Sequence, residues 1–392
     1  MPPGRGERAP RRPHHGDRSP RRARRAARPP HPVDPAGRLR LRRSGCLRAH
    51  RRHRPPARRA DHQRGGGPRR RRPDRLQRPA RAHRSAPDRG RSPRGPLRGP
   101  DPVRLRRTLL FVPGVTPERI AKAAASRADG VILDLEDAVA PPQKAQAREW
   151  VVAALRRVDF GGRERIVRVN PLDTPEGLAD LVAVVPLGPD ALLLPKVRSA
   201  ADVEGAAAAV SRLEADAGLT AGAIRLHLIV ETVAAVLGVR RLADASPRLV
   251  GLFFGAGDFV RETGGRLVAS RMSELHAMSE LLLAARAAGR DAIDTPYFDL
   301  ASAAGLETHA RFAADLGYDG KAVIHPNQID VVNGCFTPTA SAVTEARRIV
   351  EAYEAAEASG RGALTVAGQF VDAVHVEMAR TLLTRARLAG VA

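Results

Sequence analysis

The chain has 392 residues, a formal net charge of +24 and only two Cys, and these properties exclude several classes of protein. No apolar run reaches the ~18 residues that cross a bilayer, and no signal-peptide-like apolar stretch follows the first charges, so no membrane partner is expected. Cys46 and Cys335 fall in segments of unlike composition. A structural disulfide is therefore not expected, Cys335 is expected to be inert, and a reducing, cytoplasmic compartment fits.

The positive charge belongs to the first hundred residues. They contain 33 Arg, no Lys and 6 Asp or Glu, whereas residues 101–392 sum to −3. They also hold 18 of the 32 Pro and lack Ile, Phe, Tyr and Trp. Such a segment cannot bury enough apolar surface to offset the entropy lost on ordering. Residues 1–105 are therefore predicted to be a disordered Arg/Pro-rich segment.

Three interpretations of residues 1–105 compete. An Arg-rich arm can neutralise phosphates and bind nucleic acid, but this one lacks the aromatic side chains that stack on bases. A targeting peptide would be shorter and richer in Ser. Arg in place of every Lys, among Pro, Gly, Ala and His, is also what GC-rich DNA upstream of a true start would encode. We favour this last interpretation, a mis-assigned start, and do not expect nucleic acid as a partner.

From Arg106 onward, apolar runs alternate with Ala-rich amphipathic stretches. The predicted strands are 108–112, 130–135, 165–169, 191–195, 225–230, 249–254, 291–295 and 321–325. Helical periodicity marks 117–128, 143–158, 174–185, 200–217 and 271–288, with Asp202 as a helix-start acid. Strands that are apolar on both faces, each followed by a helix, indicate a parallel sheet covered by helices.

Eight such units favour an α/β fold, a (β/α)8 TIM barrel over residues 106–335. An open doubly wound sheet is the structural alternative. Two further helical stretches, 345–358 and 371–388, predict a C-terminal helical extension over residues 336–392, which could serve for subunit contacts.

Nearly every predicted strand ends in an ionisable side chain or a tight turn. In such a barrel the active site forms at the carboxyl ends of the strands, where buried charge is costly unless paired or metal-bound. The residues at these ends are Pro113, Gly114, Asp134, Glu136, Asp137, Arg168, Asn170, Lys196, Glu231, Thr232, Gly257, Asp258, Asp294, Thr295 and His325. Several carboxylates with Arg and Lys indicate a hard cation and an anionic substrate. Mg²⁺ usually takes one or two protein carboxylates, and Glu231 and Asp258, on neighbouring predicted strands, fit that pattern.

Each of these residues also has a structural interpretation. A strand-end carboxylate can be a helix cap or a loop charge, and Arg168 can be an ion-pair partner of Glu136 or Asp137. Lys196 could form a Schiff base, another route to aldol chemistry, although an available carboxylate pair favours the metal. His325 can be a hydrogen-bonded residue of the rim.

The motifs, taken in order, resemble one family. They are RTLLFVPG at 107–114, GVILDLEDAV at 130–139, VRVNPLDTP at 167–175, LPKV at 194–197, IVET at 229–232, FGAGDF at 254–259, AIDTPY at 292–297 and DGKAVIHPNQ at 319–328. From about Arg106 to the C-terminus the chain closely resembles the HpcH/HpaI aldolase and citrate lyase β-subunit family, on its CitE-like branch. Malyl-CoA and citramalyl-CoA lyases are close relatives within it.

The resemblance implies a TIM barrel that uses Mg²⁺ as its cofactor. A Glu after the fifth strand and an Asp after the sixth, here Glu231 and Asp258, are the implied ligands. Arg168 would contact a substrate oxygen and stabilise developing negative charge. Glu136 and Asp137 would lie beside the metal and order its waters and Arg168, so these three residues are the implied catalytic groups of the barrel.

Outside the barrel, residues 362–372 (GALTVAGQFVD) resemble a C-terminal segment of the acyl-CoA lyases. Its Asp, here Asp372, would reach a neighbouring subunit's site as acid or base. The resemblance therefore implies a homo-oligomer, a trimer or a hexamer. Lys196, together with Arg168 and Glu231, is expected to bind the substrate.

The chain departs from the family pattern at three places. Val233 replaces the usual Pro after Glu231-Thr, Gly257 stands where a Glu is common before the Asp, and Ala373-Val374 replace Ala-Pro. None of these changes removes an expected ligand. Gly257 removes a nearby carboxylate, so substrate choice is expected to differ there.

The expected activity is Mg²⁺-dependent cleavage, or formation, of a C–C bond in a hydroxyacyl-CoA thioester such as malyl-, citramalyl- or citryl-CoA. The products would be a 2-oxo acid and an acyl-CoA, with thioester hydrolysis as a possible later step. One alternative is an aldolase acting on a free hydroxy-oxo acid without CoA. Another is an inactive barrel tethered to nucleic acid by the Arg-rich arm.

Overall fold

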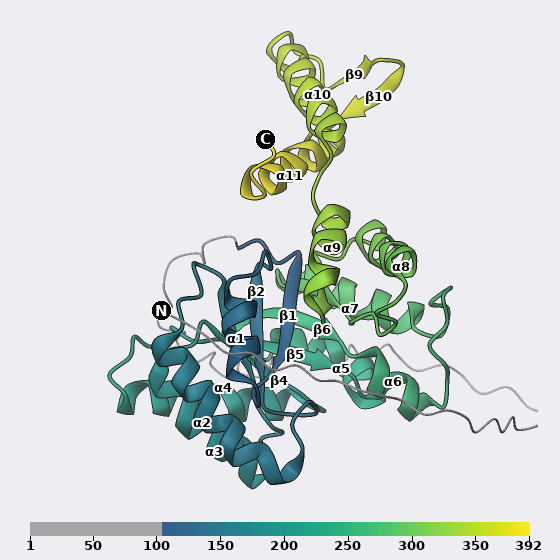
Figure 1. The fold of residues 1–392 in the computed structure, drawn as a ribbon. Helices are drawn as coiled ribbons and strands as arrows, with labels where there is room; N and C mark the ends of the chain where they lie inside the picture. The colour runs from purple at the N-terminus through teal and green to yellow at the C-terminus, as the bar shows by residue number, and fades with distance from the viewer. Residues whose placement is uncertain (1–103) are drawn as a thin grey trace, which may run out of the picture. The chain divides into compact units, whose positions relative to one another are not determined.

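The computed structural model describes residues 104–392, and its first eight strands close into a barrel (Figure 1). These strands are β1 Thr108–Pro113, β2 Gly130–Asp134, β3 Glu164–Arg168, β4 Ala191–Leu194, β5 Arg225–Val230, β6 Leu249–Phe254, β7 Asp291–Asp294 and β8 Gly320–Val323. Neighbouring strands run parallel, and β1 pairs with β8 through Thr108 and Lys321. This pairing confirms the predicted (β/α)8 barrel, and the alternative of an open doubly wound sheet is wrong.

Helices follow the strands and cover the barrel from outside. They are α1 Pro117–Ala124, α2 Lys144–Arg157, α3 Pro175–Val184, α4 Ala200–Asp216, α5 Val233–Asp244, α6 Ala256–Thr263, α7 Leu275–Ala288, α8 Ala303–Leu316 and α9 Ile329–Phe336. Asp202 forms a capping box with Ser199 at the start of α4, as predicted for a helix-start acid. The helix expected from residue 271 begins at Leu275 instead, because Arg271 has φ +56°, a value that a helix excludes.

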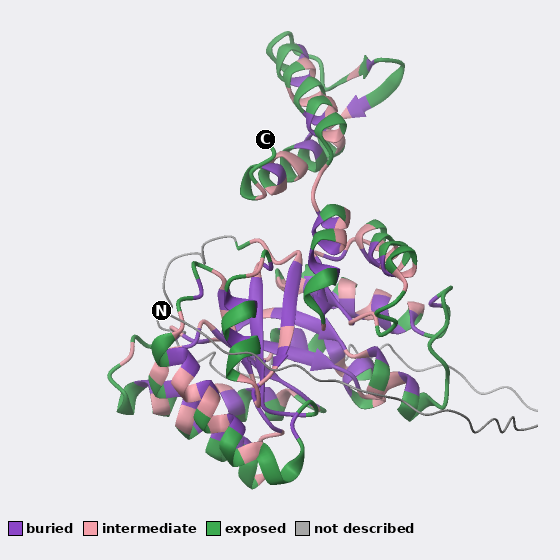
Figure 2. Cartoon of the chain, viewed as in Figure 1, coloured by how far each residue is buried: buried purple, intermediate pink, exposed green. Residues whose placement is uncertain are grey.

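The strands are buried on both faces, as their apolar sequences predict. Alternate residues point into the barrel, where Leu109, Ile132, Ile166, Leu193, Ile229, Phe253 and Ile293 pack together. The intervening residues pack outward against the helices in a second, larger core. In Figure 2 the strands are accordingly purple over most of their length, whereas the helices bury one side only.

A buried ion network closes the amino end of the barrel. Arg106 donates to Glu164 at 2.6 and 2.8 Å and to Asp291 at 2.5 Å, and the buried ring of His227 lies 3.4 Å from Glu164. These groups fill the interior below the apolar layer. The opposite end, where the strands terminate, is therefore where a ligand can enter the barrel.

The segment after the barrel contains a β-hairpin that the sequence analysis did not predict. It comprises α10 Ala340–Ala358, the antiparallel strands β9 Ala363–Val366 and β10 Gln369–Asp372, and α11 Ala373–Leu388. The turn residues Ala367 and Gly368 both have positive φ, as the tight turns of two-residue hairpins require. Residues 371 and 372, expected in the last helix, belong to β10, and Asp372 instead precedes α11 as its N-cap.

Several expectations fall outside the described residues. The disorder of the Arg/Pro-rich segment, its nucleic-acid binding, the mis-assigned start and the state of Cys46 all concern residues 1–103. Within residues 104–392, Cys335 is a free thiol, and none of the helices is both long and apolar enough to cross a bilayer.

Candidate functional site

The ends of β2 and β3 hold Arg168 in a fixed position. Asp134 and Arg168 are partners in the strand register, so their side chains emerge beside each other. Arg168 donates from Nε and Nη2 to the two oxygens of Asp134, at 2.7 and 2.6 Å, and lies 2.9 Å from Glu136 through Nη1. Its guanidinium also lies over the Phe111 ring, 4.9 Å from the ring centre. A bidentate pair of this kind fixes the guanidinium plane as well as its position.

Asp134 is the strongest partner of Arg168, whereas the sequence analysis considered Glu136 or Asp137. Glu136 is a partner too, but Asp137 is exposed and pairs with Lys196 at 3.1 Å instead. The register of β2 against β3 decides the partner, because it places Asp134, and not Asp137, beside Arg168.

Lys196 links the carboxylates around it. Its backbone has φ +54°, rare for a residue other than Gly, and its N–H donates to Oε1 of Glu231 at 2.6 Å. Its Nζ lies 3.0 Å from Asp258, 3.1 Å from Asp137 and 3.2 Å from Glu136. Burial lowers the pKa of Lys196, but these carboxylates outweigh burial and raise the pKa above its ordinary value. A permanently protonated amine is a poor nucleophile, which argues against the Schiff-base alternative.

Glu231 is a buried carboxylate at the end of β5. Thr232 caps the start of α5 by accepting from Ala235, which fixes the chain just after Glu231. Burial, opposed by Lys196, raises the pKa of Glu231 to about 7. A Cβ at Gly255 would lie 2.4 Å from the Glu231 Cβ and 2.9 Å from its Oε2. The glycine therefore makes room for this carboxylate between β5 and β6.

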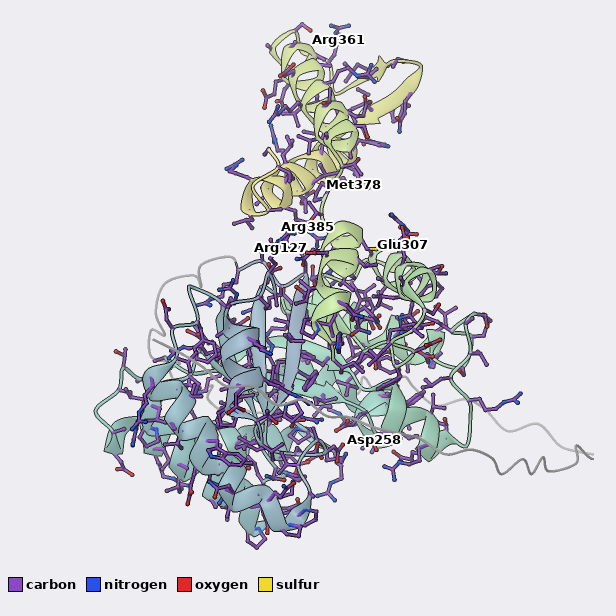
Figure 3. All side chains as sticks on the ribbon, in the orientation of Figure 1. Arg127, Asp258, Glu307, Arg361, Met378 and Arg385 are labelled. Atoms are coloured by element: carbon purple, nitrogen blue, oxygen red, sulfur yellow. The ribbon has the colours of Figure 1, made fainter. Side chains whose placement is uncertain are left out.

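Asp258 lies in the first turn of α6, just after β6, where Figure 3 labels it. Its Oδ2 accepts from Lys196 at 3.0 Å and its Oδ1 from Arg261, one helical turn further on. Burial raises the pKa of Asp258, but these two hydrogen bonds outweigh it and hold the pKa below its usual value. Arg261 is not among the residues expected from the sequence, although its i+3 spacing from Asp258 on a helix is the signal for such a contact.

Arg168, Glu231 and Asp258 line a cavity of about 560 Å³ at the carboxyl end of the barrel. The charged residues of its lining are Asp134, Asp137, Arg168, Glu231, Asp258 and Arg261. Its apolar lining includes Phe111, Ile229, Phe253, Phe298, Ala322 and Ile324. A cavity of this size, part apolar and part charged, suits a small organic acid with an apolar attachment.

The charged residues of this lining, together with Glu136 and Lys196, are called the rim cluster below. It contains five carboxylates, from Asp134, Glu136, Asp137, Glu231 and Asp258, and three cations, from Arg168, Lys196 and Arg261. When all are ionised, the cluster carries a formal charge of −2, which a divalent cation would neutralise. Burial raises the pKa values of Glu136 and Glu231, and repulsion by neighbouring carboxylates adds to this effect.

The donor set fits Mg²⁺ better than a metal that needs a closed protein shell. Among residues 104–392, no group of three or more His, Cys, Asp or Glu is arranged to enclose a metal. Mg²⁺ keeps several waters and commonly binds one or two carboxylates together with substrate oxygens. Glu231 and Asp258 offer such a pair at the cavity wall.

A second buried cluster lies where Asp294, the last residue of β7, pairs with Lys321 near the start of β8. Asp294 accepts from Arg271 at 2.7 Å and from Lys321 at 2.7 Å, and Arg271 also pairs with Glu274 at 2.9 Å. Lys321 further lies 2.8 Å from Nδ1 of His309 and donates to the carbonyl oxygen of Thr295. These five charged or titratable residues, called the β7–β8 cluster below, contain two carboxylates, from Asp294 and Glu274, and two cations, from Arg271 and Lys321. Asp294, one of the strand-end candidates, is therefore a structural ion-pair partner.

Two other expected residues lie apart from the cavity lining. His325 is exposed and caps the turn Pro326–Gln328 by accepting from Asn327, which supports its structural interpretation. Asp372 caps α11, where it accepts from the backbone of Val374 at 3.1 Å and lies 2.7 Å from Nδ1 of His375. The hydrogen bond from His375 lowers the pKa of Asp372. Asp372 is not among the residues that line the cavity of its own chain.

Comparison with known proteins places this barrel in a family. The family model described as HpcH/HpaI aldolase/citrate lyase matches residues 107–326. The citrate lyase subunit beta of Escherichia coli is 38% identical over 74% of this chain and 96% of its own, and a (3S)-malyl-CoA thioesterase of Cereibacter sphaeroides is 38% identical over 71% of this chain and 94% of its own. The structure of CitE from Mycobacterium tuberculosis in complex with magnesium, acetoacetate and coenzyme A superposes with a TM-score of 0.59 at 35% identity, covering 72% of this chain and 98% of that one. As its motifs predicted, the chain belongs to the HpcH/HpaI aldolase/citrate lyase family, a family of lyases.

Proposed function

We propose that the protein is a Mg²⁺-dependent C–C lyase that cleaves, or forms, a hydroxyacyl-CoA thioester of the malyl-, citramalyl- or citryl-CoA kind. The observation that carries the proposal is the rim cluster, whose carboxylates exceed its cations around a cavity at the carboxyl end of a barrel of this family. The relatives named after malyl-CoA, and the related structure that holds magnesium and coenzyme A, support the substrate class and the cofactor.

In this proposal Glu231 and Asp258 hold the metal. When bound, Mg²⁺ would polarise the carboxylate and hydroxyl oxygens of a 2-hydroxy acid unit. Arg168 would stabilise negative charge that develops on the thioester oxygen, because Asp134 and Glu136 already fix its guanidinium at the cavity wall. Fixed donors of this kind need no reorganisation during the reaction.

Lys196 would bind the substrate carboxylate while its backbone N–H keeps Glu231 in place. Glu136 and Asp137 would support this arrangement by holding Arg168 and the Lys196 ammonium on one side of the cavity. Binding, orientation and charge stabilisation are thus shared among side chains that follow or end five neighbouring strands, β2 to β6.

Asp372 is the proposed acid or base, supplied to the cavity of a neighbouring subunit. An aspartate is ionised near neutral pH, and this form can accept a proton from the acyl-CoA carbon in the condensing direction. In the cleaving direction the hydroxyl loses a proton and becomes the oxo group, the C–C bond breaks, and its electron pair passes to the carbon next to the thioester carbonyl, which forms an enolate. Asp372 would first accept that hydroxyl proton and then return a proton to the carbon. The proposal therefore requires a homo-oligomer, a trimer or hexamer, in which residues 106–335 provide the barrel and 336–392 reach the partner.

The decisive experiment is a panel of malyl-, citramalyl- and citryl-CoA, each with and without Mg²⁺, in which 2-oxo acid and free thiol are measured separately. A lyase releases the 2-oxo acid only with Mg²⁺, and free thiol appears later or not at all. Free thiol without 2-oxo acid would indicate a simple thioesterase. Release of a 2-oxo acid from free hydroxy acids alone would favour the CoA-independent aldolase.

A further inference from the structure

The cavity is open on the side of Gly257, next to Asp258. A Cβ added at Gly257 would meet a single neighbour, the Phe298 Cζ atom, at 4.0 Å. A longer side chain at this position would occupy that space, and a glutamate would also add a sixth carboxylate to the rim cluster. Its absence leaves both room and less negative charge beside Asp258.

Arg261 lies on the same helix as Gly257, α6, four residues further along the chain. It lies one turn after Asp258 on α6, lines the cavity, and contacts Asp258 through Oδ1 while Lys196 contacts Oδ2. The Arg261 side chain is 76% exposed, and exposed ion pairs of this kind contribute little to stability. A metal bound at Asp258 would compete for the same oxygens, so Arg261 can turn to another anion at little cost.

We propose that Gly257 and Arg261 form a subsite for a second carboxylate on the acid portion of the substrate. The inference rests on the proposed lyase function and narrows its substrate class: the released 2-oxo acid is a dicarboxylate, and citryl-CoA is preferred over citramalyl-CoA or malyl-CoA. Arg261 suits this role because its planar guanidinium binds a carboxylate through two parallel N–H groups.

The proposed divalent cation would remove the repulsion between the rim cluster and an anionic substrate. When all its groups are ionised, the cluster has a formal charge of −2, which the cation would bring to zero before substrate binds. The first carboxylate of the substrate would then take the metal and Lys196, and the second would take Arg261. The phosphates of a CoA thioester are a different source of negative charge, but they lie a whole pantetheine arm away from the reacting carbon.

The test compares binding of malate and lactate, two stable 2-hydroxy acids that differ by one carboxylate. Both enantiomers of each acid are titrated by calorimetry into the Mg²⁺-loaded protein, and 3′,5′-ADP is titrated as a probe for CoA phosphates. The wild type is expected to bind malate about tenfold or more tightly than lactate, the size of one favourable charge-assisted contact. Arg261→Gln removes that preference while lactate binding stays within about twofold, and Arg261→Lys retains part of it.

Two further variants keep the result specific. Gly257→Glu should weaken malate binding selectively, by filling the open side of the cavity and repelling the second carboxylate. Arg240→Gln is the matched control, because Arg240 is 75% exposed and pairs with Glu280 on a helix outside the cavity. It should leave both acids unaffected.

Several outcomes would overturn the subsite. They are equal Mg²⁺-dependent binding of malate and lactate, an Arg261→Gln variant that behaves like Arg240→Gln, or an Arg261→Gln variant that weakens only 3′,5′-ADP. In these cases the proposed lyase function would stand if the thioester panel still released a 2-oxo acid. Failure of the panel, together with no binding of either acid, would reject both proposals.

Discussion

The rim cluster and the β7–β8 cluster differ in their balance of charge. In the β7–β8 cluster the carboxylates of Asp294 and Glu274 are matched by Arg271 and Lys321, and every pair is fully buried. In the rim cluster five carboxylates face three cations, and the group opens onto a cavity. Both clusters use strand-end residues of similar type. The comparison teaches that a position at a strand end makes a residue a candidate for the site, whereas an excess of carboxylates over cations distinguishes a binding site from a structural cluster.

The largest expected effect breaks the rim cluster. Asp258→Asn and Glu231→Gln should each lower kcat/KM for the CoA thioester by roughly 10³-fold, because several kcal/mol of charge stabilisation by the metal are lost. Steady-state kinetics over a Mg²⁺ series measures the effect, and circular dichroism checks that the fold is retained. Asp137→Asn, which changes an exposed carboxylate, is the milder comparison within the cluster. Full turnover in both ligand variants would refute the metal assignment.

A substitution in the β7–β8 cluster should lower the stability of the protein and leave its Mg²⁺ dependence unchanged. Asp294→Asn leaves Arg271 and Lys321 buried with one carboxylate fewer, so the free energy of unfolding should fall by about 3–5 kcal/mol. Chemical denaturation measures this loss, and the Mg²⁺ dissociation constant of the folded fraction should stay close to that of the wild type. An Asp294→Asn protein of normal stability but weakened Mg²⁺ binding would reverse the roles of the two clusters.

His309 makes the β7–β8 cluster sensitive to acid. Burial lowers the pKa of His309 from 6.5 to about 4, and its Nδ1 faces the Lys321 ammonium at 2.8 Å. Between pH 6.5 and 4 the unfolded chain therefore binds a proton that the folded chain does not, so stability falls as the pH falls through this range. The loss reaches about 3 kcal/mol at its limit. Denaturation at pH 7 and pH 4.5 should show a smaller difference in His309→Gln than in the wild type; an equal difference in both would contradict the assignment.

Much of this arrangement follows from local sequence, and the rest depends on contacts between distant residues. Apolar runs and helical periodicity predicted the eight strands and the helices after them, and the polar residues at strand ends predicted which side chains meet. The sequence could not separate Asp294 from Asp258, since both end a strand. Asp294 is neutralised by Arg271, 23 residues earlier, and by Lys321, 27 residues later. Pairing at such separations is set by packing, and it has no signature in the neighbouring residues.

The smallest expected effect is the change in the free energy of unfolding caused by Glu231→Gln, and its sign depends on whether Mg²⁺ is present. Burial raises the pKa of Glu231 from 4.5 in the unfolded chain to about 7 in the folded protein. Above pH 7 both states carry the ionised carboxylate, but ionisation costs more free energy in the folded state, so the ionised Glu231 lowers stability. Without Mg²⁺ at pH 8, Glu231→Gln should therefore raise the free energy of unfolding by about 1 kcal/mol, after allowing for a weaker hydrogen bond from the Lys196 N–H.

Saturating Mg²⁺ should reverse this order of stability. At a concentration of about 100 times the dissociation constant, Mg²⁺ stabilises the wild type by about 2.7 kcal/mol, whereas the variant gains little. Thermal or chemical unfolding of both proteins, with Mg²⁺ and with EDTA, measures the crossover. A carboxylate that served only the fold would behave like Asp294, and its removal would destabilise the protein under both conditions. Stabilisation without the metal and relative destabilisation with it is the behaviour expected only of a residue kept for a ligand.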